Sequence, residues 1–452
     1  NCPVAKPQIN EVRRLVRLGL PLVLTFASDW GLVTTATVTS SWISASAVAA
    51  VGLTFTLGMS TVVFFFLTLS ALTVITADLS GSGSNNKVGA LMKSGLSLAA
   101  AFCGVLAAML VVLWYALPYL LHSAEAAQTA QDFLSVMAWF VPFELFGYVF
   151  VFISIGLGRT FWVGVISVLS IPLLIALTWA LAFGNLGFEA MGTRGIAFAI
   201  LITWSIRAAA FLLLVLQKEF SGIHFFGSVA ETGLNNRGRI LKIGVPLGLS
   251  EVSTHGWLAV IGVLAAQLGV VALAAHNIAY NIFMLAHICV FGLTRATVIR
   301  LGALVGETGS GAHLWPFLKT ALTVISCFSC LALGIVSMGS GQIAAYYSDD
   351  IQVVRMLTGL LVLVAALRLV DDLGLFFQAT LEGLQRTSKI PFVRALTQWV
   401  LGVPVCILMA QWLGLYGVWI GMGATLLCSA FLFSWQLRRE ITHSNLPIRS
   451  SY

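Results

Sequence analysis

The chain has 452 residues, of which 59% are hydrophobic and only 9% are charged. A soluble domain carries about 25% charged residues, so this composition excludes a soluble globular protein and predicts a polytopic membrane protein. Each membrane crossing needs roughly 20 apolar residues, and with short connections the chain holds about a dozen of them.

The predicted membrane spans are runs of apolar residues that end at clusters of Gly, Ser, Asn and Pro. In chain order they are 15–37, 47–77, 88–117, 128–155, 161–184, 191–216, 241–267, 269–297, 316–340, 351–382, 390–412 and 415–437. The longest polar stretch runs from Lys218 to Lys242 and divides the chain into halves. We therefore predict an all-α polytopic membrane protein with a six-helix lobe at 1–216, a cytoplasmic linker at 217–238 and a second six-helix lobe at 239–452.

The formal net charge is +7, which on its own could indicate a nucleic-acid partner. Its placement argues otherwise, because 20 of the 24 Lys and Arg residues fall at alternate span ends and loops, on the side that holds both termini. Arg194 and Arg355 fall on the other side. Basic residues stay in the cytoplasm, so we expect both termini there, in a bacterial inner membrane, with the lipid bilayer and no nucleic acid as partner.

Two segments half a chain apart are nearly the same. The run RLVRLGLPLVL from Arg14 returns from Arg239 as RILKIGVPLGL, at an offset of 225 residues. A second echo pairs GLGRT at 156–160 with GLQRT at 383–387. Because repeated transporter halves form their site where they face each other, the repeat predicts two lobes with a cleft between them.

The sequence lacks the motifs of ATP-driven transporters, potassium channels and zinc metalloproteases. There is no GxxxxGK[ST] loop for ATP, no TVGYG-like filter and no HExxH helix. Cys327 and Cys330 form a CxxC inside an apolar span, where packing is the more common use of cysteine. These absences leave ion-gradient coupling, a passive path or an intramembrane enzyme, and no cofactor is expected beyond a coupling Na+ or H+.

Acidic residues inside the spans are the strongest functional signal, because an ionised carboxylate at a span centre costs about 2.5–3.5 kcal/mol. They are Asp29, Glu144, Glu251, Asp371 and Asp372.

Glu251 and His255 lie one helical turn apart in GLSEVSTHGW, where Ser and Thr oxygens surround them. Oxygen ligands suit a hard cation, so this turn is a candidate Na+ or proton site. A Glu–His pair that only locks helix packing remains the alternative.

Asp371 and Asp372 lie near the middle of span ten, three and four residues after Arg368. One carboxylate could bind Na+, a proton or a cationic substrate, and Arg368 could tune it. Adjacent residues lie about 100° apart on a helix, so the two carboxylates cannot face one cavity equally, and we favour Asp371. A structural Arg–Asp pair is the alternative.

The first half of the chain offers fewer candidates. Asp29 matches Thr254 at the 225-residue offset, one turn past Glu251, so the two lobes carry acids at related depths. Glu144 follows Pro142, which frees a backbone carbonyl, and could either line the substrate cleft or serve a kink.

His276 opens span eight, with Tyr280 and Asn281 following on nearby faces. His276 is a further candidate for ion coupling, although a lone histidine is more often a packed residue. Tyr280 and Asn281 are candidates for the substrate cleft, beside Glu144 and Arg368.

At this point the sequence resembles the multidrug and toxic compound extrusion (MATE) transporters of the NorM-like kind. The resemblance spans the chain and is strongest in RLGLPLVL, KIGVPLGL, LGVVALAAHNIAYN and GLYGVWIGM. It implies two six-helix bundles around a central cavity, and export of organic cations in exchange for Na+ or protons.

The family's ion ligands match this sequence unevenly. The span-ten acid of the family falls on Asp371, whereas the span-seven glutamate falls on Thr254, one turn after Glu251. In the first lobe the family's ligand positions fall on Ala36, Leu174 and Thr178. The resemblance therefore implies ion coupling in the second lobe, at Asp371 and Glu251 together with His255 and His276.

We interpret the chain as an ion-coupled antiporter, not an enzyme, that works as a monomer on small organic substrates by alternating access of its lobes. A dedicated exporter of one metabolite or toxin is the nearest alternative. A flippase of lipid-linked precursors, an intramembrane enzyme and a receptor role are further ones.

Overall fold

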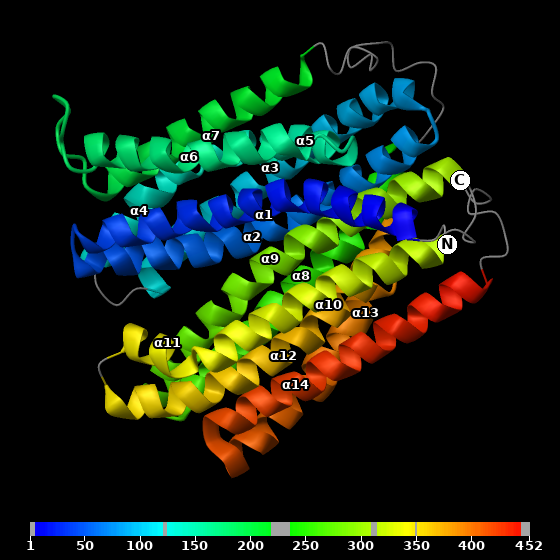
Figure 1. Ribbon diagram of the computed structural model, residues 1–452. Helices are drawn as coiled ribbons and strands as arrows, with labels where there is room; N and C mark the ends of the chain where they lie inside the picture. The colour runs from blue at the N-terminus through cyan, green and yellow to red at the C-terminus, as the bar shows by residue number, and fades with distance from the viewer. Residues whose placement is uncertain (1–4, 121–123, 218–235, 309–313, 349, 444–452) are drawn as a thin grey trace. The chain divides into compact units, whose positions relative to one another are not determined.

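The computed structural model describes residues 5–120, 124–217, 236–308, 314–348 and 350–443, and every regular element in these ranges is a helix (Figure 1). The α-helices are α1 (Ala5–Ser41), α2 (Ala45–Gly81), α3 (Val88–Leu120), α4 (Ala124–Met137), α5 (Phe140–Gly156), α6 (Thr160–Leu181), α7 (Thr193–Val215), α8 (Asn236–Gln267), α9 (Val270–Thr308), α10 (Leu314–Met338), α11 (Ser340–Tyr347), α12 (Ile351–Gly383), α13 (Ile390–Ala395) and α14 (Val403–His443). A 3₁₀ turn, η1 (Asn85–Lys87), precedes α3, and a π-helical segment, η4 (Leu396–Gly402), joins α13 to α14.

Ten helical segments of the described chain are long and apolar enough to cross a membrane, and the bent pair α4–α5 makes an eleventh. One of the ten, Ile390–Glu440, has 51 residues. At about 1.5 Å per residue it is more than twice the roughly 30 Å of a bilayer core. It breaks at Gly414, whose φ of 57° and ψ of −134° are not helical. Twelve crossings therefore fit the described chain, and the predicted all-α polytopic fold is confirmed.

Two local features differ from the predicted spans. The span predicted at 128–155 is bent by 44° between Met137 and Phe140, before Pro142 rather than at it. A short helix, α11, follows α10 where the sequence predicts only the end of a span. The first break carries no Gly or Pro between Met137 and Phe140, so apolar periodicity does not reveal it, whereas the second falls at Gly339, a signal that marks the end of α10 but not the short helix after it.

Residue contacts divide the chain into two compact units of similar size. The N-terminal unit is Leu24–Gly248, and the C-terminal unit is Asn1–Val23 with Leu249–Tyr452. Each boundary lies two residues after a proline inside a helix, Pro21 in α1 and Pro246 in α8. The lobe limits predicted from the polar stretch stay a prediction, because residues 218–235 of the linker lie outside the described residues.

The backbone repeats certain unusual conformations in both units. Gly192 precedes α7 with φ 57° and ψ −132°, almost the same values as Gly414. Such a conformation is nearly restricted to glycine. Gly158 and Gln385 both have positive φ, 75° and 59°, and hold the same place in GLGRT and GLQRT. The sequence echo therefore corresponds to equivalent turns after α5 and α12.

In the N-terminal unit α5 packs against α2, α3 and α7. The contact with α2 is close, because a Cβ added to Gly156 would lie 2.6 Å from the carbonyl oxygen of Thr73. Figure 1 shows α5, α6 and α7 as neighbouring helices of this unit. This packing places the inner faces of α5 and α7 against each other.

In the C-terminal unit α12 packs against α9, α10 and α14. Its apolar core includes residues of α8, α9, α12 and α14 around Trp419, whose side chain is fully buried. The side chain of Asp350 caps the start of α12 by accepting from the backbone N–H of Gln352 at 2.8 Å. The helix that carries Arg368, Asp371 and Asp372 therefore packs against three other helices.

Candidate functional site

A buried arginine organises the polar core of the C-terminal unit. Arg368 on α12 forms an ion pair with Asp371 at 2.7 Å and donates through Nε to Asp372 at 2.7 Å. Ser329 on α10 donates its hydroxyl to the other oxygen of Asp372 at 2.5 Å. The i,i+3 pairing of Arg368 with Asp371 anticipated from the sequence is thus present, and Asp372 shares the same guanidinium.

Helix α9 completes this arginine's surroundings. Arg368 Nη1 lies 3.1 Å from Nδ1 of His287, and its guanidinium lies over the ring of Phe283 at 4.5 Å. Because a guanidinium can only donate, Nδ1 of His287 must accept, which leaves that imidazole neutral while the bond holds. Two carboxylates then face one guanidinium, so among Arg368, Asp371 and Asp372 the acids outnumber the arginine by one. Arg394, which donates to Gln378, and Arg295, which pairs with Glu382, also act on His287.

The two aspartates differ in access. The side chain of Asp371 is 12% exposed, whereas that of Asp372 is 1% exposed and has bonds from two other helical residues. Asp372 is therefore a buried partner of Arg368, and Asp371 is the more exposed carboxylate of the two.

Glu251 and His255 on α8 do not form the side-chain pair that the sequence suggests. Nδ1 of His255 lies 2.9 Å from the backbone carbonyl oxygen of Glu251, and its ring is exposed. Glu251 itself is half-buried. Its charge and that of Asp371 both act on Tyr280 of α9, so these two carboxylates and the phenol share one neighbourhood.

Other residues of α8 and α9 have different surroundings. His276 is buried, with its ring 6.3 Å from Tyr280 and 5.6 Å from Trp419, and its Nδ1 has no partner in the described chain. Asn281 is exposed and donates to the carbonyl of Asn277 at 2.9 Å. The structure therefore brings Tyr280 and His276 together and leaves Asn281 apart from them.

A second buried arginine organises the N-terminal unit. Arg207 on α7 pairs with Asp29 on α1 at 2.6 Å, and Tyr148 on α5 donates to the other oxygen of Asp29 at 3.0 Å. Nη2 of Arg207 also lies 3.5 Å from the hydroxyl of Ser167 on α6. Side chains from four helices thus contact one another, and Asp29 is part of this cluster of ion pairs and hydrogen bonds.

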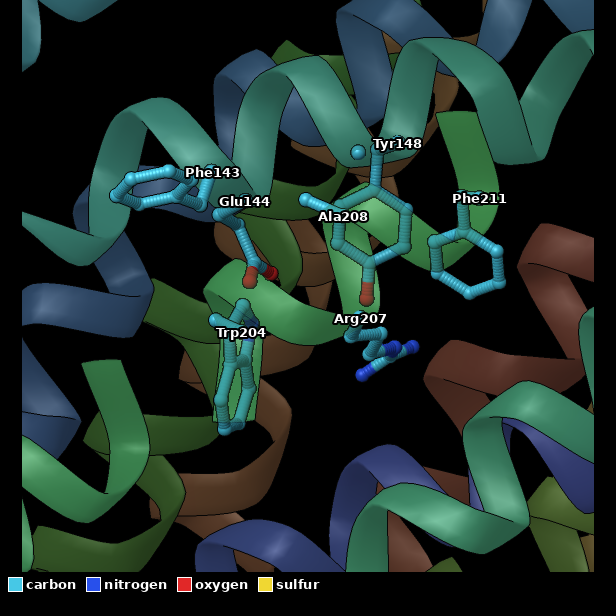
Figure 2. A pocket seen from close by; sticks show the side chains of 8 residues that line it. Phe143, Glu144, Tyr148, Trp204, Arg207, Ala208 and Phe211 are labelled. Carbon is cyan, nitrogen blue, oxygen red and sulfur yellow. The ribbon is translucent and has the colours of Figure 1, made fainter. Parts of the chain in front are cut away.

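Glu144 on α5 faces the same cluster. Figure 2 shows its carboxylate directed toward Trp204 of α7, while the hydroxyl of Tyr148 is directed toward Arg207. Oε2 of Glu144, Nε1 of Trp204, and Nε and Nη1 of Arg207 are all buried without a hydrogen-bond partner in the described chain. The cavity that these residues line has a volume of about 10 Å³, enough for one water at most.

Among the described residues, no group of three or more His, Cys, Asp or Glu is arranged to hold a metal ion. The positions where the family resemblance would place first-lobe ligands are buried without charge, since Ala36 and Leu174 are 0% exposed and Thr178 is 1% exposed. The charged cluster of the N-terminal unit is built from other residues.

Several of these contributors, among them Tyr148 and Ser167, are missed by the sequence interpretation. His287 and Ser329 have neutral side chains in apolar spans, and Arg207 lies 178 positions after its partner Asp29. An arginine in the middle of a span is a signal that could have singled out Arg207, because such a charge needs a partner inside the protein.

The family model described as MatE matches residues 21–180 and again residues 246–408. Both matches start at or next to the helix prolines that mark the sequence repeat. The chain belongs to the MATE family of transporters. Members of this family transport and are not enzymes, so the intramembrane enzyme alternative is excluded.

Curated relatives of this MATE transporter extend over its whole length. It is 26% identical over 457 residues to a probable multidrug resistance protein NorM from Xanthomonas axonopodis pv. citri (strain 306), covering 98% of each chain. A probable NorM from Xanthomonas campestris pv. campestris is also 26% identical, over 460 residues and with the same coverage. The protein is therefore a MATE family efflux transporter similar to multidrug-resistance proteins.

Solved structures share its fold. An outward-facing multidrug resistance MATE family transporter superposes with a TM-score of 0.87 at 19% identity, covering 96% of this chain and 97% of that one. A MATE transporter of Vibrio cholerae gives a TM-score of 0.87 at 17% identity, covering 98% and 99%. At these identities the likeness establishes the fold alone.

Proposed function

We propose that this MATE transporter is a secondary active antiporter that exports organic cations in exchange for Na+ or H+. The observation that carries the proposal is Asp371, a partly accessible carboxylate in a cluster where two acids face one guanidinium. A membrane interior does not tolerate such an excess charge without a compensating cation.

The coupling site we propose lies around Asp371 and Glu251, whose carboxylates both act on Tyr280. Carboxylate and phenol oxygens suit a hard monovalent cation, and a proton can neutralise the same carboxylates. An ion that enters neutralises the charge that holds a cationic substrate, and the substrate leaves. The coupling is reciprocal, and inward movement of each charge draws about 2.3 kcal/mol per 100 mV of membrane potential.

His276 supports the substrate side of the proposal. Its ring lies 6.3 Å from that of Tyr280, so the α9 face near Asp371 combines aromatic side chains with negative charge. Organic cations bind to aromatic faces through cation–π attraction. We expect Tyr280 to contact substrate more directly than the exposed Asn281.

The setting we propose is the bacterial plasma membrane, with both termini in the cytoplasm and a monomer as the working unit. Its support is the one-sided distribution of Lys and Arg, which follows the positive-inside rule. Labelling of single cysteines placed at Glu189 and Arg386 with an impermeant reagent on intact cells tests it. Reaction at Glu189 and protection at Arg386 are expected, and the reverse pattern would overturn the topology.

The experiment that tests the function measures dye efflux in vesicles with an imposed Na+ or H+ gradient. Asp371→Asn should strongly reduce gradient-driven efflux, and Glu251→Gln should weaken it. Glu189→Gln, which removes an exposed acid, is the control and should transport like the wild type. Unchanged efflux in Asp371→Asn refutes the proposed coupling site. Equal loss in Asp29→Asn and Glu251→Gln would indicate coupling shared by both units.

A dedicated exporter of a single metabolite is the second candidate, and one observation favours it. The first-lobe positions implied by the family resemblance carry Ala36, Leu174 and Thr178, without any ionisable group. A panel of chemically varied cationic dyes separates the two candidates, because a multidrug exporter moves several of them and a dedicated exporter moves none.

A further inference from the structure

The polar cluster of the N-terminal unit does not balance its charges. Asp29 and Glu144 are two carboxylates, and Arg207 is the one cation that acts on both of them. The guanidinium is paired with Asp29, whereas Oε2 of Glu144 has no partner in the described chain. If both acids were ionised, the buried cluster would hold one uncompensated negative charge, which a low-dielectric interior strongly disfavours.

The groups around Glu144 are unsuited to a metal cation. The cavity is lined by the unpartnered donors Nε and Nη1 of Arg207 and Nε1 of Trp204. Besides Glu144, the one lining residue with a side-chain oxygen is Tyr148, whose hydroxyl already donates to Asp29. The remaining lining residues contribute no side-chain oxygen and are Phe143, Gly147, Ala208 and Phe211. Hard cations need several oxygen ligands, so a proton is the compensating charge that fits this cavity.

No other charged group of the described chain acts on Glu144. Of the helices against α5, α7 provides Arg207, and α1 reaches the cluster through Asp29. Helices α2, α3, α4 and α6 provide no charge that acts on this carboxyl. On α5 itself Tyr148 already donates its hydroxyl to Asp29.

The internal repeat places Glu144 in a meaningful position. GLGRT and GLQRT align at an offset of 227, and at that offset Glu144 coincides with Asp371. Gly158 and Gln385 both have positive φ, so the turns after α5 and α12 have similar local backbone conformations. Each unit thus has an acid at the equivalent position of the equivalent helix. In each unit this acid lies near a buried arginine that also pairs with a second acid.

We propose that the N-terminal unit binds one exchangeable proton at Glu144, separate from the coupling ion at Asp371, so that two positive charges exchange per transport cycle. A proton from water binds a carboxylate oxygen of Glu144 and later leaves to water, with no other bond made or broken. In the protonated state Arg207 pairs with Asp29 alone, as it does in this structure at 2.6 Å. When the proton leaves, the unpartnered N–H groups of Arg207 and Trp204 can donate hydrogen bonds to the carboxylate of Glu144. Transport of the proton rests on the proposed antiport function, but its binding does not.

Binding is tested on purified protein by infrared difference spectroscopy of protonated carboxyl groups during a pH titration. Glu144→Gln, which has nearly the shape of the neutral acid, should fold normally and lose one carboxyl band, whereas Glu189→Gln should keep it. Glu144→Asp should restore a shifted band. A wild-type spectrum that is unchanged in Glu144→Gln would overturn the proposal, whether or not the protein transports any tested dye.

Transport is tested by the substrate ratio that vesicles reach at equilibrium with one pH unit imposed, the membrane potential clamped at zero and no Na+ gradient. Each coupled proton multiplies that ratio by about ten, so Glu144→Gln should lower it about tenfold. An unchanged ratio overturns the role in transport. Asp371→Asn separates the hypotheses. If that variant keeps the full wild-type substrate ratio while Glu144→Gln loses its tenfold factor, the coupling site proposed at Asp371 fails and the one at Glu144 stands.

Discussion

The two units hold their intramembrane charges in contrasting ways. In the C-terminal unit Arg368 pairs with Asp371 and Asp372 on its own helix, and α10 and α9 add Ser329 and His287. In the N-terminal unit the arginine pairs with an acid from another helix, Asp29 on α1, and the acid on α5 stays unbonded. One scaffold repeat therefore supports an intrahelical cluster and an interhelical one, and each leaves one carboxylate in excess.

The largest expected effect is on the intrahelical cluster. Arg368→Met leaves two buried carboxylates without their guanidinium and should lower the free energy of unfolding by about 3–5 kcal/mol, the range for breaking a buried ion pair. Thermal unfolding of detergent-purified protein measures it. Arg355→Gln removes an exposed arginine of the same helix and should have almost no effect. Similar stability of the two variants would contradict the central place of Arg368.

The interhelical cluster should be less sensitive. Asp29 is 24% exposed and keeps its bond from Tyr148, so Arg207→Met should destabilise by about 2–3 kcal/mol, less than breaking a fully buried pair. Adding Asp29→Asn removes the stranded charge and should recover part of the loss in the same unfolding assay. A double variant that is less stable than Arg207→Met would show that the pair is not what Arg207 contributes.

The bond from Ser329 should have an intermediate effect. Ser329→Ala leaves Asp372 without one charge-assisted bond, and such a bond contributes about 1.5–3 kcal/mol. Ser337 lies on the same helix, and its buried hydroxyl has no partner in the described chain, so Ser337→Ala is a matched control that should change little. If the two substitutions change the unfolding temperature equally, Ser329 does not stabilise Asp372.

The smallest effect is expected at Tyr148. Tyr148→Phe removes one partly buried hydrogen bond to Asp29 while Arg207 keeps its ion pair, so a loss of about 1 kcal/mol is expected. The same unfolding assay measures it. A loss as large as that of Arg207→Met would mean that the phenol, rather than the guanidinium, holds Asp29 in place.

Much of the fold follows from the composition and from the internal repeat. Each membrane span must be apolar over its length, and the repeated sequence forms equivalent turns in both units. The pairing of Arg368 with Asp371 could be predicted, since a helix brings residues three apart to one face. The same rule misleads for Glu251 and His255, whose spacing is right but whose contact goes through a backbone carbonyl.

Tertiary partners are what the sequence cannot supply. Asp29 meets Arg207 only because α1 and α7 pack in one unit, and no local pattern encodes that contact. His287 contacts Arg368 because of the face that α9 presents to α12, which the sequence does not specify. Glu144 is found as a candidate from its charge alone, but its lack of a partner is visible only once the four helices are in place.

The central claim is that the excess carboxylate of the C-terminal unit, Asp371, binds the coupling ion. The most direct test is gradient-driven efflux from vesicles that contain Asp371→Asn, compared with Asp372→Asn and with the exposed control Glu189→Gln. We predict that Asp371→Asn folds but responds much less than the wild type to an imposed Na+ or H+ gradient, while Glu189→Gln responds fully. Asp372→Asn should mainly lower the stability of the protein. A folded Asp371→Asn protein with wild-type gradient-driven efflux would contradict the account.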